Sequence, residues 1–170
     1  LGYEHKDDND WNKFEDILNS LDKIIKSGKI KSFGVSNFTT SQMEMFKGKV
    51  EILYNQINLS LTHLDHMFDG TLEYMQANKI LPMAYSPLGS YFKEGSNKIK
   101  KVVESLKDKY SCTDYQLLIS WLLKHPSKVY PVIGTTKSDR IKSTLESLKI
   151  EIDLIDWFEL LEASVGKRVP

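Results

Sequence analysis

The sequence has no excess of either charge and only one cysteine. Lysine plus arginine and aspartate plus glutamate both number 23, so the formal net charge is zero. Without a basic field a protein has no broad electrostatic attraction for nucleic acid or an anionic membrane, so we expect neither as a partner. Cys112 has no second thiol to pair with. This excludes an internal disulfide framework and fits a reducing compartment.

Long apolar runs and targeting segments are also lacking. The uninterrupted apolar stretches are only a few residues long, and no basic segment followed by an apolar one stands near the N-terminal end. We therefore expect a cytoplasmic protein. The remaining histidines after His5 have no ligand-like spacing with Cys112 or with paired carboxylates, so no metal site is expected.

The residues that are present suit one folded core. The chain has 170 residues, of which 41% are hydrophobic and 27% charged, and this length supports a single domain over 1–170. The first residues read as an element already under way, which suggests a cut end. The last helix closes at Gly166, as at a natural terminus.

Helical and strand patterns alternate along the chain. Thr39 or Thr40 is placed to cap the helix that ends at Phe46, and the helix over 139–148 would turn Ile141, Leu145 and Leu148 inward. The predicted strands cover 30–35, 51–56, 81–85 and 129–133, after a strand stub at 1–4, and the predicted helices cover 14–25, 39–46, 72–77, 99–110, 113–124, 139–148 and 156–163.

The long connections between the predicted strands define the fold class. A connection of a dozen or more residues cannot form a hairpin, so successive strands must pair in parallel, and the class is α/β. About five strands follow from the stub and the four clear βα units. An eight-stranded βα barrel needs about 250 residues. We therefore predict the C-terminal part of a (β/α)₈ barrel, with the first three units absent.

Polar residues lie at the ends of the predicted strands over 30–35 and 51–56. In GVSNF, Ser36 and Asn37 offer a hydroxyl and a carboxamide, and Gln56 adds a second carboxamide at the end of YNQ. An amide that both donates and accepts matches the primary amide of a nicotinamide. The alternative is that Ser36 and Asn37 cap the next helix. We expect Asn55 to be structural and to tie neighbouring strand ends.

The third strand ends in AYSPLGS. Tyr85 presents a flat ring and Ser86 a hydroxyl, while the backbone N–H groups from Leu88 to Ser90 can approach a pyrophosphate because Gly89 has no Cβ. The alternative is an ordinary β-turn led by Pro87.

The fourth strand leads into PVIGTTKSDR. Gly134 and Thr135, with Thr136 beside them, provide donors at the start of a helix, and Lys137 and Arg140 add positive charge within one turn. Such a cluster suits a phosphorylated adenosine. The alternative is a solvated first helical turn with ordinary surface charges.

In their order and wording, these four motifs resemble the aldo-keto reductase family. The tail resembles bacterial members that end in a Trp-Phe helix and a G-x-x-V-P segment, here Trp157-Phe158 and Gly166 to Pro170. The resemblance implies NADPH-dependent reduction of an aldehyde or ketone, with NADP preferred over NAD. Many relatives carry a Glu and an Asn shortly after the arginine, where this chain has Ser143 and Thr144.

The resemblance also assigns roles. It implies that Ser36, Asn37 and Gln56 bind the nicotinamide amide and that the Tyr85 ring stacks on the nicotinamide. It implies that the pyrophosphate is contacted by Ser86, Leu88 and Gly89. It implies that the adenosine phosphate is contacted by Gly134, Thr135, Lys137 and Arg140.

His5 matches the active-site histidine that orients the substrate carbonyl. The family's proton-donating Tyr, with its Lys and Asp, comes from the first half of the barrel and has no counterpart in this sequence. Loss of a positioned acid reduces the rate of carbonyl reduction by about 10²–10⁴-fold. We therefore expect the 170 residues of this chain to be nearly inactive on their own. The missing N-terminal half-barrel is expected to pack against this chain. The alternatives are a non-catalytic NADPH-binding regulatory subunit and an inactive fragment.

Overall fold

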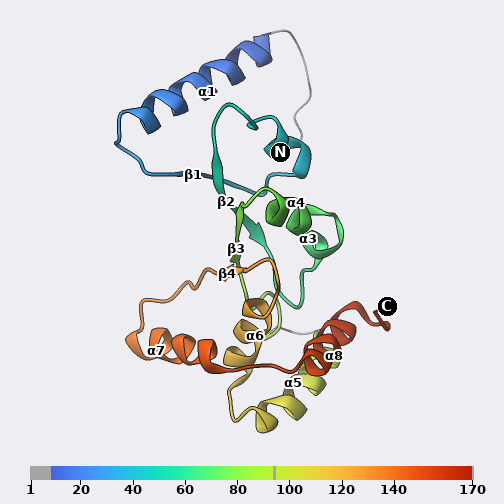
Figure 1. The fold of residues 1–170 in the computed structure, drawn as a ribbon. Coiled ribbons are helices and arrows are strands. Elements are labelled where there is room, and N and C mark those ends of the chain that lie inside the picture. Colours follow the sequence, from blue (N-terminus) through green and yellow to red (C-terminus); the bar gives the residue numbers. More distant parts are fainter. Residues whose placement is uncertain (1–8, 94, 170) are drawn as a thin grey trace.

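A four-stranded parallel sheet organises the computed structural model, which describes residues 9–93 and 95–169. Its strands lie in chain order, so that β1 and β4 form the two edges (Figure 1). Each neighbouring pair is parallel, as the long crossovers predict. The strands are β1 (Phe33–Ser36), β2 (Ile52–Asn58), β3 (Leu81–Tyr85) and β4 (Tyr130–Pro131).

Helices lie at both ends of the molecule and also beside the middle of the sheet, where α3 and α4 are found (Figure 1). In Figure 1, α1 lies at one end of the molecule and α5 to α8 gather at the other. The helices are α1 (Asn9–Lys26), α2 (Thr40–Glu44), α3 (Asp65–Phe68), α4 (Thr71–Ala77), α5 (Asn97–Lys109), α6 (Asp114–Leu123), α7 (Ser138–Glu146), the 3₁₀ turn η1 (Ser147–Lys149) and α8 (Leu154–Val165).

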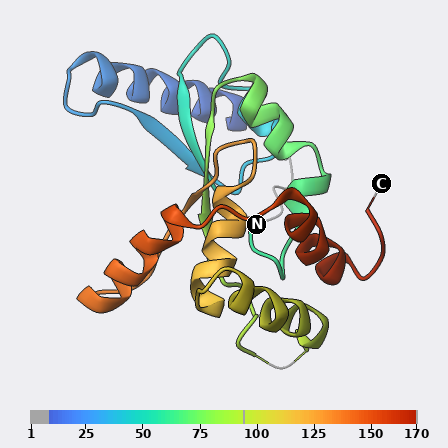
Figure 2. The same ribbon diagram turned by 60° about the horizontal axis from the view of Figure 1, so that its bottom comes forward.

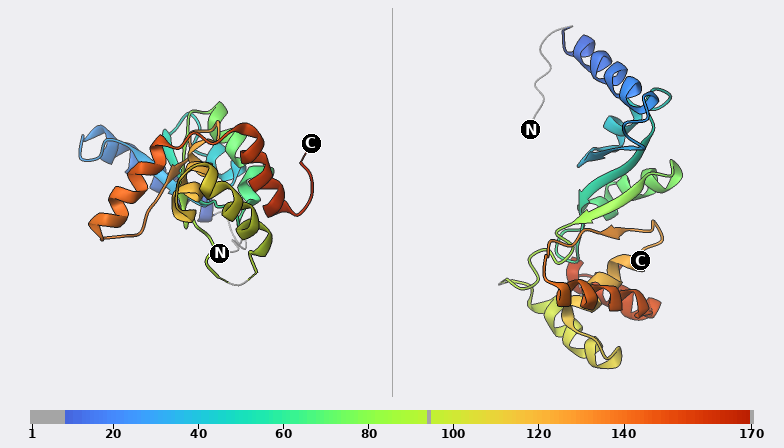
Figure 3. Two further views of the ribbon diagram at one scale, coloured as in Figure 1. Left: turned by 90° about the horizontal axis from the view of Figure 1, so that it is seen from below. Right: turned by 90° about the vertical axis from the view of Figure 1, so that its left-hand side faces the viewer.

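The apolar core is divided into two clusters. One surrounds Phe46 and joins α1 and α2 to β2 and α4. The larger cluster joins the sheet to α5, α6 and α8. At its centre the rings of Trp121 and Trp157 stack 5.2 Å apart, and each indole N–H donates to the other residue's backbone carbonyl. The side view in Figure 3 shows the resulting elongated molecule, with α1 far from α5 to α8.

Local sequence chemistry explains where several helices begin and end. Thr39 caps α2 and Thr113 caps α6, each through a capping box with the glutamine three residues later. Gly166 ends α8 in the left-handed conformation, with φ of 80°. The predicted helix ends at these three positions are confirmed, with Thr39 rather than Thr40 as the cap of α2.

The fourth strand is shorter than predicted. The pattern predicts a strand over 129–133, but only Tyr130 and Pro131 pair with β3, followed by one further bond from the Val132 N–H to the Ala84 carbonyl at 2.8 Å. Pro131 has no N–H for a ladder and β4 lies at an edge of the described sheet, which is where proline is tolerated in strands.

The prediction for the inner face of α7 is wrong. Ile141, Leu145 and Leu148 are 39%, 55% and 65% exposed. A different side of the helix, next to the apolar stripe, faces α6 and is held there by hydrogen bonds to the Thr144 hydroxyl and the Ser143 carbonyl. Because these polar contacts decide which side meets α6, the apolar stripe is left exposed. Figure 2 shows α7 extending to one side of α6.

Two predictions fall outside the described residues, namely the strand stub at 1–4 and the position of His5. Within 9–93 and 95–169, no helix has the length and apolar character needed to span a membrane.

Candidate functional site

Most of the predicted site residues lie at the carboxyl ends of four adjacent parallel strands or shortly after them. Gln56 is the exception, because β2 continues to Asn58 instead of ending at Gln56 as predicted. Ser36 is in register with Gln56, and Asn58, two residues beyond Gln56, is in register with Tyr85. Adjacent strands lie about 4.8 Å apart, so the elbows after β1 and β4 are separated by about 14 Å across the sheet. Only an elongated ligand could contact both ends of this row.

The elbow after β1 is held by the backbone of β2. The Ser36 hydroxyl and the Asn37 N–H both donate to the Gln56 carbonyl, at 3.1 and 2.9 Å. Asn37 takes the left-handed conformation, with φ of 55°. Among the described residues, no hydrogen bond engages the side-chain amides of Asn37 and Gln56. Both carboxamides therefore remain available to a ligand, whereas Ser36 has already donated its hydrogen.

The alternative role for Ser36 and Asn37 as helix caps is wrong. The residue that caps α2 is Thr39, whose hydroxyl accepts from the Gln42 N–H at 3.3 Å. Ser36 and Asn37, three and two residues before Thr39, are exposed at the strand end. Their contact with β2, rather than helix capping, accounts for their conformation.

Asn55 ties two strand ends together. Its side-chain amide donates to the Phe38 carbonyl at 2.9 Å and accepts from the Phe38 N–H at 3.3 Å. The side chain is fully buried, so these bonds satisfy polar groups that would otherwise be costly to bury. The prediction that Asn55 is structural is confirmed.

The elbow after β3 is a β-turn. The Gly89 N–H donates to the Ser86 carbonyl at 2.7 Å, with Pro87 at the second position, so the turn alternative is correct as a description of the backbone. The Ser90 N–H donates to the Thr62 hydroxyl at 2.8 Å. These two N–H groups are thus already engaged, contrary to expectation. No partner engages the Leu88 N–H in the described chain, which leaves it available.

Two residues that the motifs did not indicate lie beneath this elbow. A Cβ on Gly89 would come within 2.0 Å of the Thr62 hydroxyl and 2.4 Å of the Ser60 hydroxyl, and Gly89 has φ of 52°. Ser60 and Thr62 belong to a tight turn after β2. Nearly thirty residues of sequence separate them from Gly89, so no local sequence pattern predicts this contact.

One pocket joins the β3 and β4 elbows. Its volume is about 250 Å³. Of the predicted cofactor residues it contains six, and it adds Tyr115 from α6, which the sequence did not indicate. The lining residues are Ser86, Pro87, Leu88, Gly89, Tyr115, Ile133, Gly134, Thr135 and Arg140. The β3 and β4 motifs therefore converge on one space.

Other predicted residues lie outside this pocket. Ser36, Asn37 and Gln56 lie at the opposite end of the row of strand ends, and Tyr85 is half-buried between the two groups at the end of β3. Lys137 occupies the N-cap position of α7, with its N–H donating to the Thr135 hydroxyl at 3.2 Å and its side chain exposed. Of the two predicted cations, only Arg140 lines the pocket.

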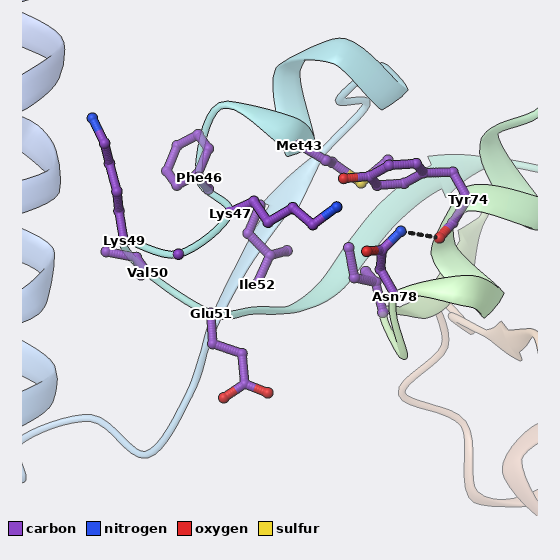
Figure 4. A pocket seen from close by; sticks show the side chains of 11 residues that line it. Met43, Phe46, Lys47, Lys49, Val50, Glu51, Ile52, Tyr74 and Asn78 are labelled. Atoms are coloured by element: carbon purple, nitrogen blue, oxygen red, sulfur yellow. Dashed lines mark hydrogen bonds between the residues drawn. The ribbon is translucent and has the colours of Figure 1, made fainter.

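A second pocket lies away from these strand ends, where β2 begins. It has a volume of about 330 Å³ between α2, α4 and the loop before β2 (Figure 4). Lys47 and Tyr74 both donate to the Glu44 carboxylate. Partial burial and this carboxylate raise the pKa of Tyr74 to about 12. Asn78 donates to the Tyr74 carbonyl. These polar groups already serve the packing of α2 on α4.

The donor chemistry of the row suits a phosphorylated, elongated ligand. Free carboxamides lie at one end, and a guanidinium with hydroxyl donors lines the pocket at the other. The described residues contain no cluster of three or more His, Cys, Asp or Glu side chains that could hold a metal ion.

The protein therefore belongs to the class of parallel α/β proteins, with a candidate site at the carboxyl ends of its strands, as in a βα barrel. The model of the aldo/keto reductase family matches residues 1–163, and the chain belongs to that family.

The curated relatives are oxidoreductases. The chain is 33% identical to a 6-dehydroglucose reductase of Agrobacterium fabrum over 159 residues, which cover 91% of this chain and 54% of that protein. It is also 33% identical to the uncharacterised oxidoreductase YcsN of Bacillus subtilis, with coverage of 92% and 55%. The chain thus spans about half the length of these relatives.

Solved structures agree with the partial barrel. The thermostable aldo-keto reductase Tm1743 superposes with a TM-score of 0.78 at 26% identity, over 86% of this chain and 53% of that one. An aldo-keto reductase of Klebsiella pneumoniae, crystallised with NADPH, superposes with a TM-score of 0.74 at 22% identity, over 84% and 51%. The predicted fold class is confirmed.

Proposed function

We propose that this chain supplies the cofactor-binding half of an NADPH-dependent reductase of aldehydes or ketones. The observation that carries the proposal is the row of strand-end elbows that leads from two free carboxamides to a pocket lined by Arg140. Membership of the aldo/keto reductase family and a relative with NADPH in its crystal support it. The chain would act in the cytoplasm.

The nicotinamide end would lie over β1 to β3. The side-chain amides of Asn37 and Gln56 would donate to and accept from the nicotinamide carboxamide, since each has both groups free. Ser36, whose hydrogen is donated to Gln56, would contribute as an acceptor. Tyr85 would present its ring face to the nicotinamide ring.

The adenosine end would lie in the pocket between the β3 and β4 elbows. Ser86 and the Leu88 N–H would contact the pyrophosphate, while the absence of a side chain on Gly89 keeps the turn tight against Thr62. Gly134 and Thr135 would contact the adenosine phosphate, and Arg140 would bind it with a charge-assisted contact. Lys137, exposed at the N-cap, would add charge from outside the pocket.

When bound, NADPH would supply the hydride for the carbonyl carbon. His5 would donate a hydrogen bond to the substrate carbonyl oxygen and so orient it. A proton donor must come from elsewhere, because the family's Tyr, Lys and Asp have no counterpart in these residues. We propose that an N-terminal half-barrel carries them and covers the open side of this chain.

The cofactor assignment predicts that Arg140→Ala weakens NADPH binding in the full-length protein about tenfold, through loss of a charge-assisted contact to phosphate. NADH binding should change little, since NADH lacks that phosphate. Cofactor fluorescence measures both. The control is Lys142→Ala, which removes an exposed cation from the same helix but outside the pocket. Equal NADPH affinity in Arg140→Ala and the original protein would contradict the assignment.

Turnover separates a reductase from a non-catalytic NADPH-binding subunit of the same fold. We expect the full-length protein to oxidise NADPH in the presence of a simple aldehyde such as nitrobenzaldehyde. NADPH binding without any turnover across a panel of aldehydes and ketones would favour the regulatory subunit instead.

A further inference from the structure

Tyr115 is the pocket residue that none of the sequence motifs indicates. It lies in the first turn of α6, on the crossover between β3 and β4, and it is half-buried. Among the described residues that line the pocket, it supplies the aromatic side chain. Arg140, from the first turn of α7, lines the same space. A ring and a guanidinium in one pocket form surfaces suited to a flat, electron-rich group.

The hydroxyl of Tyr115 is anchored, so the ring is held in place. It lies 2.7 Å from the Thr144 hydroxyl. Thr144 in turn donates to the Arg140 carbonyl at 2.8 Å. Because a hydroxyl carries one hydrogen, Thr144 must accept from Tyr115. The chain of bonds therefore runs in one direction, from Tyr115 through Thr144 to the backbone of Arg140.

Two more side chains of α6 fix α7 in the same way. The Gln116 amide donates to the Ser143 carbonyl at 3.1 Å. The Ser120 hydroxyl shares its one hydrogen between two carbonyls, that of Gln116 in its own helix at 2.7 Å and that of Ser147 at the end of α7 at 2.9 Å. Together with Tyr115, these bonds set the position of α7 relative to α6. Side chains from two helices that are fixed in this way lose little freedom when a ligand binds between them.

We infer that the Tyr115 ring is the platform on which the adenine of the cofactor stacks. This inference rests on the proposed function. Thr144 has donated its hydrogen and accepted a bond from Tyr115, and Ser143 has only a short hydroxyl side chain. The base is therefore held by its face, through Tyr115, rather than by hydrogen bonds to its edge from these two positions. Arg140 holds the phosphorylated ribose beside it.

The test compares Tyr115→Ala with Tyr115→Phe in the full-length protein. Three probes are used: NADPH, its adenosine half 2′,5′-ADP, and reduced nicotinamide mononucleotide, which lacks adenosine. Aromatic–base stacking is lost in the alanine variant, so its Kd for NADPH and for 2′,5′-ADP should rise about tenfold. Its Kd for the mononucleotide should not change. Tyr115→Phe keeps the ring and loses only the hydroxyl that anchors it, so its Kd for NADPH and for 2′,5′-ADP should rise much less than in Tyr115→Ala.

A fourth probe distinguishes the face of the base from its edge. The NADPH analogue with hypoxanthine in place of adenine has a similar ring face but lacks the exocyclic amine. We expect it to bind the original protein about as tightly as NADPH does, and to lose affinity in Tyr115→Ala as NADPH does. Discrimination against this analogue by the original protein would contradict recognition through the face.

The outcomes separate this inference from the proposed function. Failure of the original protein to bind NADPH overturns both. NADPH binding with an unchanged Kd in Tyr115→Ala overturns the stacking alone. An equal loss of affinity for the mononucleotide in Tyr115→Ala also overturns it, because that result shows that the ring supports the structure of the whole site rather than the base.

Discussion

At the scale of single residues, the elbow after β3 depends on contacts that run between distant segments. Gly89 closes its turn in the left-handed conformation, and the space that its Cβ would take is filled by the hydroxyls of Thr62 and Ser60. Thr62 also accepts the Ser90 N–H. The glycine is therefore required by packing against the turn after β2 as well as by backbone conformation, and the elbow is held even without a ligand.

Gly89→Ala should lower the free energy of unfolding by about 2–3 kcal/mol, through strain at positive φ together with overpacking. The measurement is urea denaturation of the full-length protein. Gly28→Ala is the matched control, since Gly28 also has positive φ, at 72°, but nothing lies within 4 Å of the added Cβ. It should cost about 1 kcal/mol. Equal losses for the two variants would show that Thr62 and Ser60 yield easily.

At the scale of elements, an ionic network joins the end of α5 to the start of α8. Asp156 is nearly buried and accepts hydrogen bonds from Lys109, at 2.6 Å, and from the Tyr110 hydroxyl. Burial by itself would raise the pKa of the Asp156 carboxyl, but these two hydrogen bonds outweigh it and hold that pKa below its ordinary value. Lys109 also pairs with Asp153.

This network predicts a pH dependence of stability. Because its pKa is lowered by folding, Asp156 stabilises the protein above the unfolded-state pKa of about 4, and the contribution is lost as the pH falls through the lower folded-state pKa. Asp156→Asn should therefore reduce the free energy of unfolding by about 1 kcal/mol near neutral pH. The difference from the original protein should shrink as the solution is acidified.

Urea denaturation over a series of pH values measures this effect. The control is Glu146→Gln, whose carboxylate pairs with an exposed lysine, Lys149, and which should change stability little. A difference between Asp156→Asn and the original protein that stays constant down to strongly acidic pH would contradict the assigned role of the carboxylate.

At the scale of the whole molecule, the described half of the barrel leaves apolar side chains uncovered. Leu145 and Leu148 on the α7 side, and Leu154 and Ile155 at the start of α8, are 55% to 82% exposed. Two edges of the sheet are also open within the described residues. Open edges and contiguous apolar surface promote association. The proposed N-terminal half-barrel would close the sheet.

Residues 1–170 produced alone should therefore self-associate and bind a hydrophobic dye such as ANS. Light scattering with size-exclusion chromatography measures the first property, and dye fluorescence the second. The double variant Leu145→Lys, Leu148→Lys should reduce both, because it replaces exposed apolar side chains by charges. A monomeric fragment that binds no dye at high concentration would contradict this expectation and show that the apolar side chains are covered in solution.

Local chemistry in the sequence was sufficient to predict the class of fold and the placement of most candidate site residues near the strand ends. Crossover lengths require parallel strands, capping residues mark helix ends, and polar residues directly after a strand must lie at its carboxyl end. The positions of Ser36 and Asn37 and of the last two elbows at strand ends could be predicted because each depends on its immediate neighbours in the chain. Their contacts with a cofactor stay a prediction.

The tertiary structure alone decided which groups are engaged and which remain free. Contacts between distant segments bring Thr62 beneath Gly89, place Tyr115 in the pocket with Arg140, and turn the Thr144 side of α7 toward α6. Periodicity identified the apolar stripe of α7 but not its orientation, since a helix can rotate about its axis until specific partners fix it. Sequence chemistry sets what each segment can do, and packing between segments selects among those possibilities.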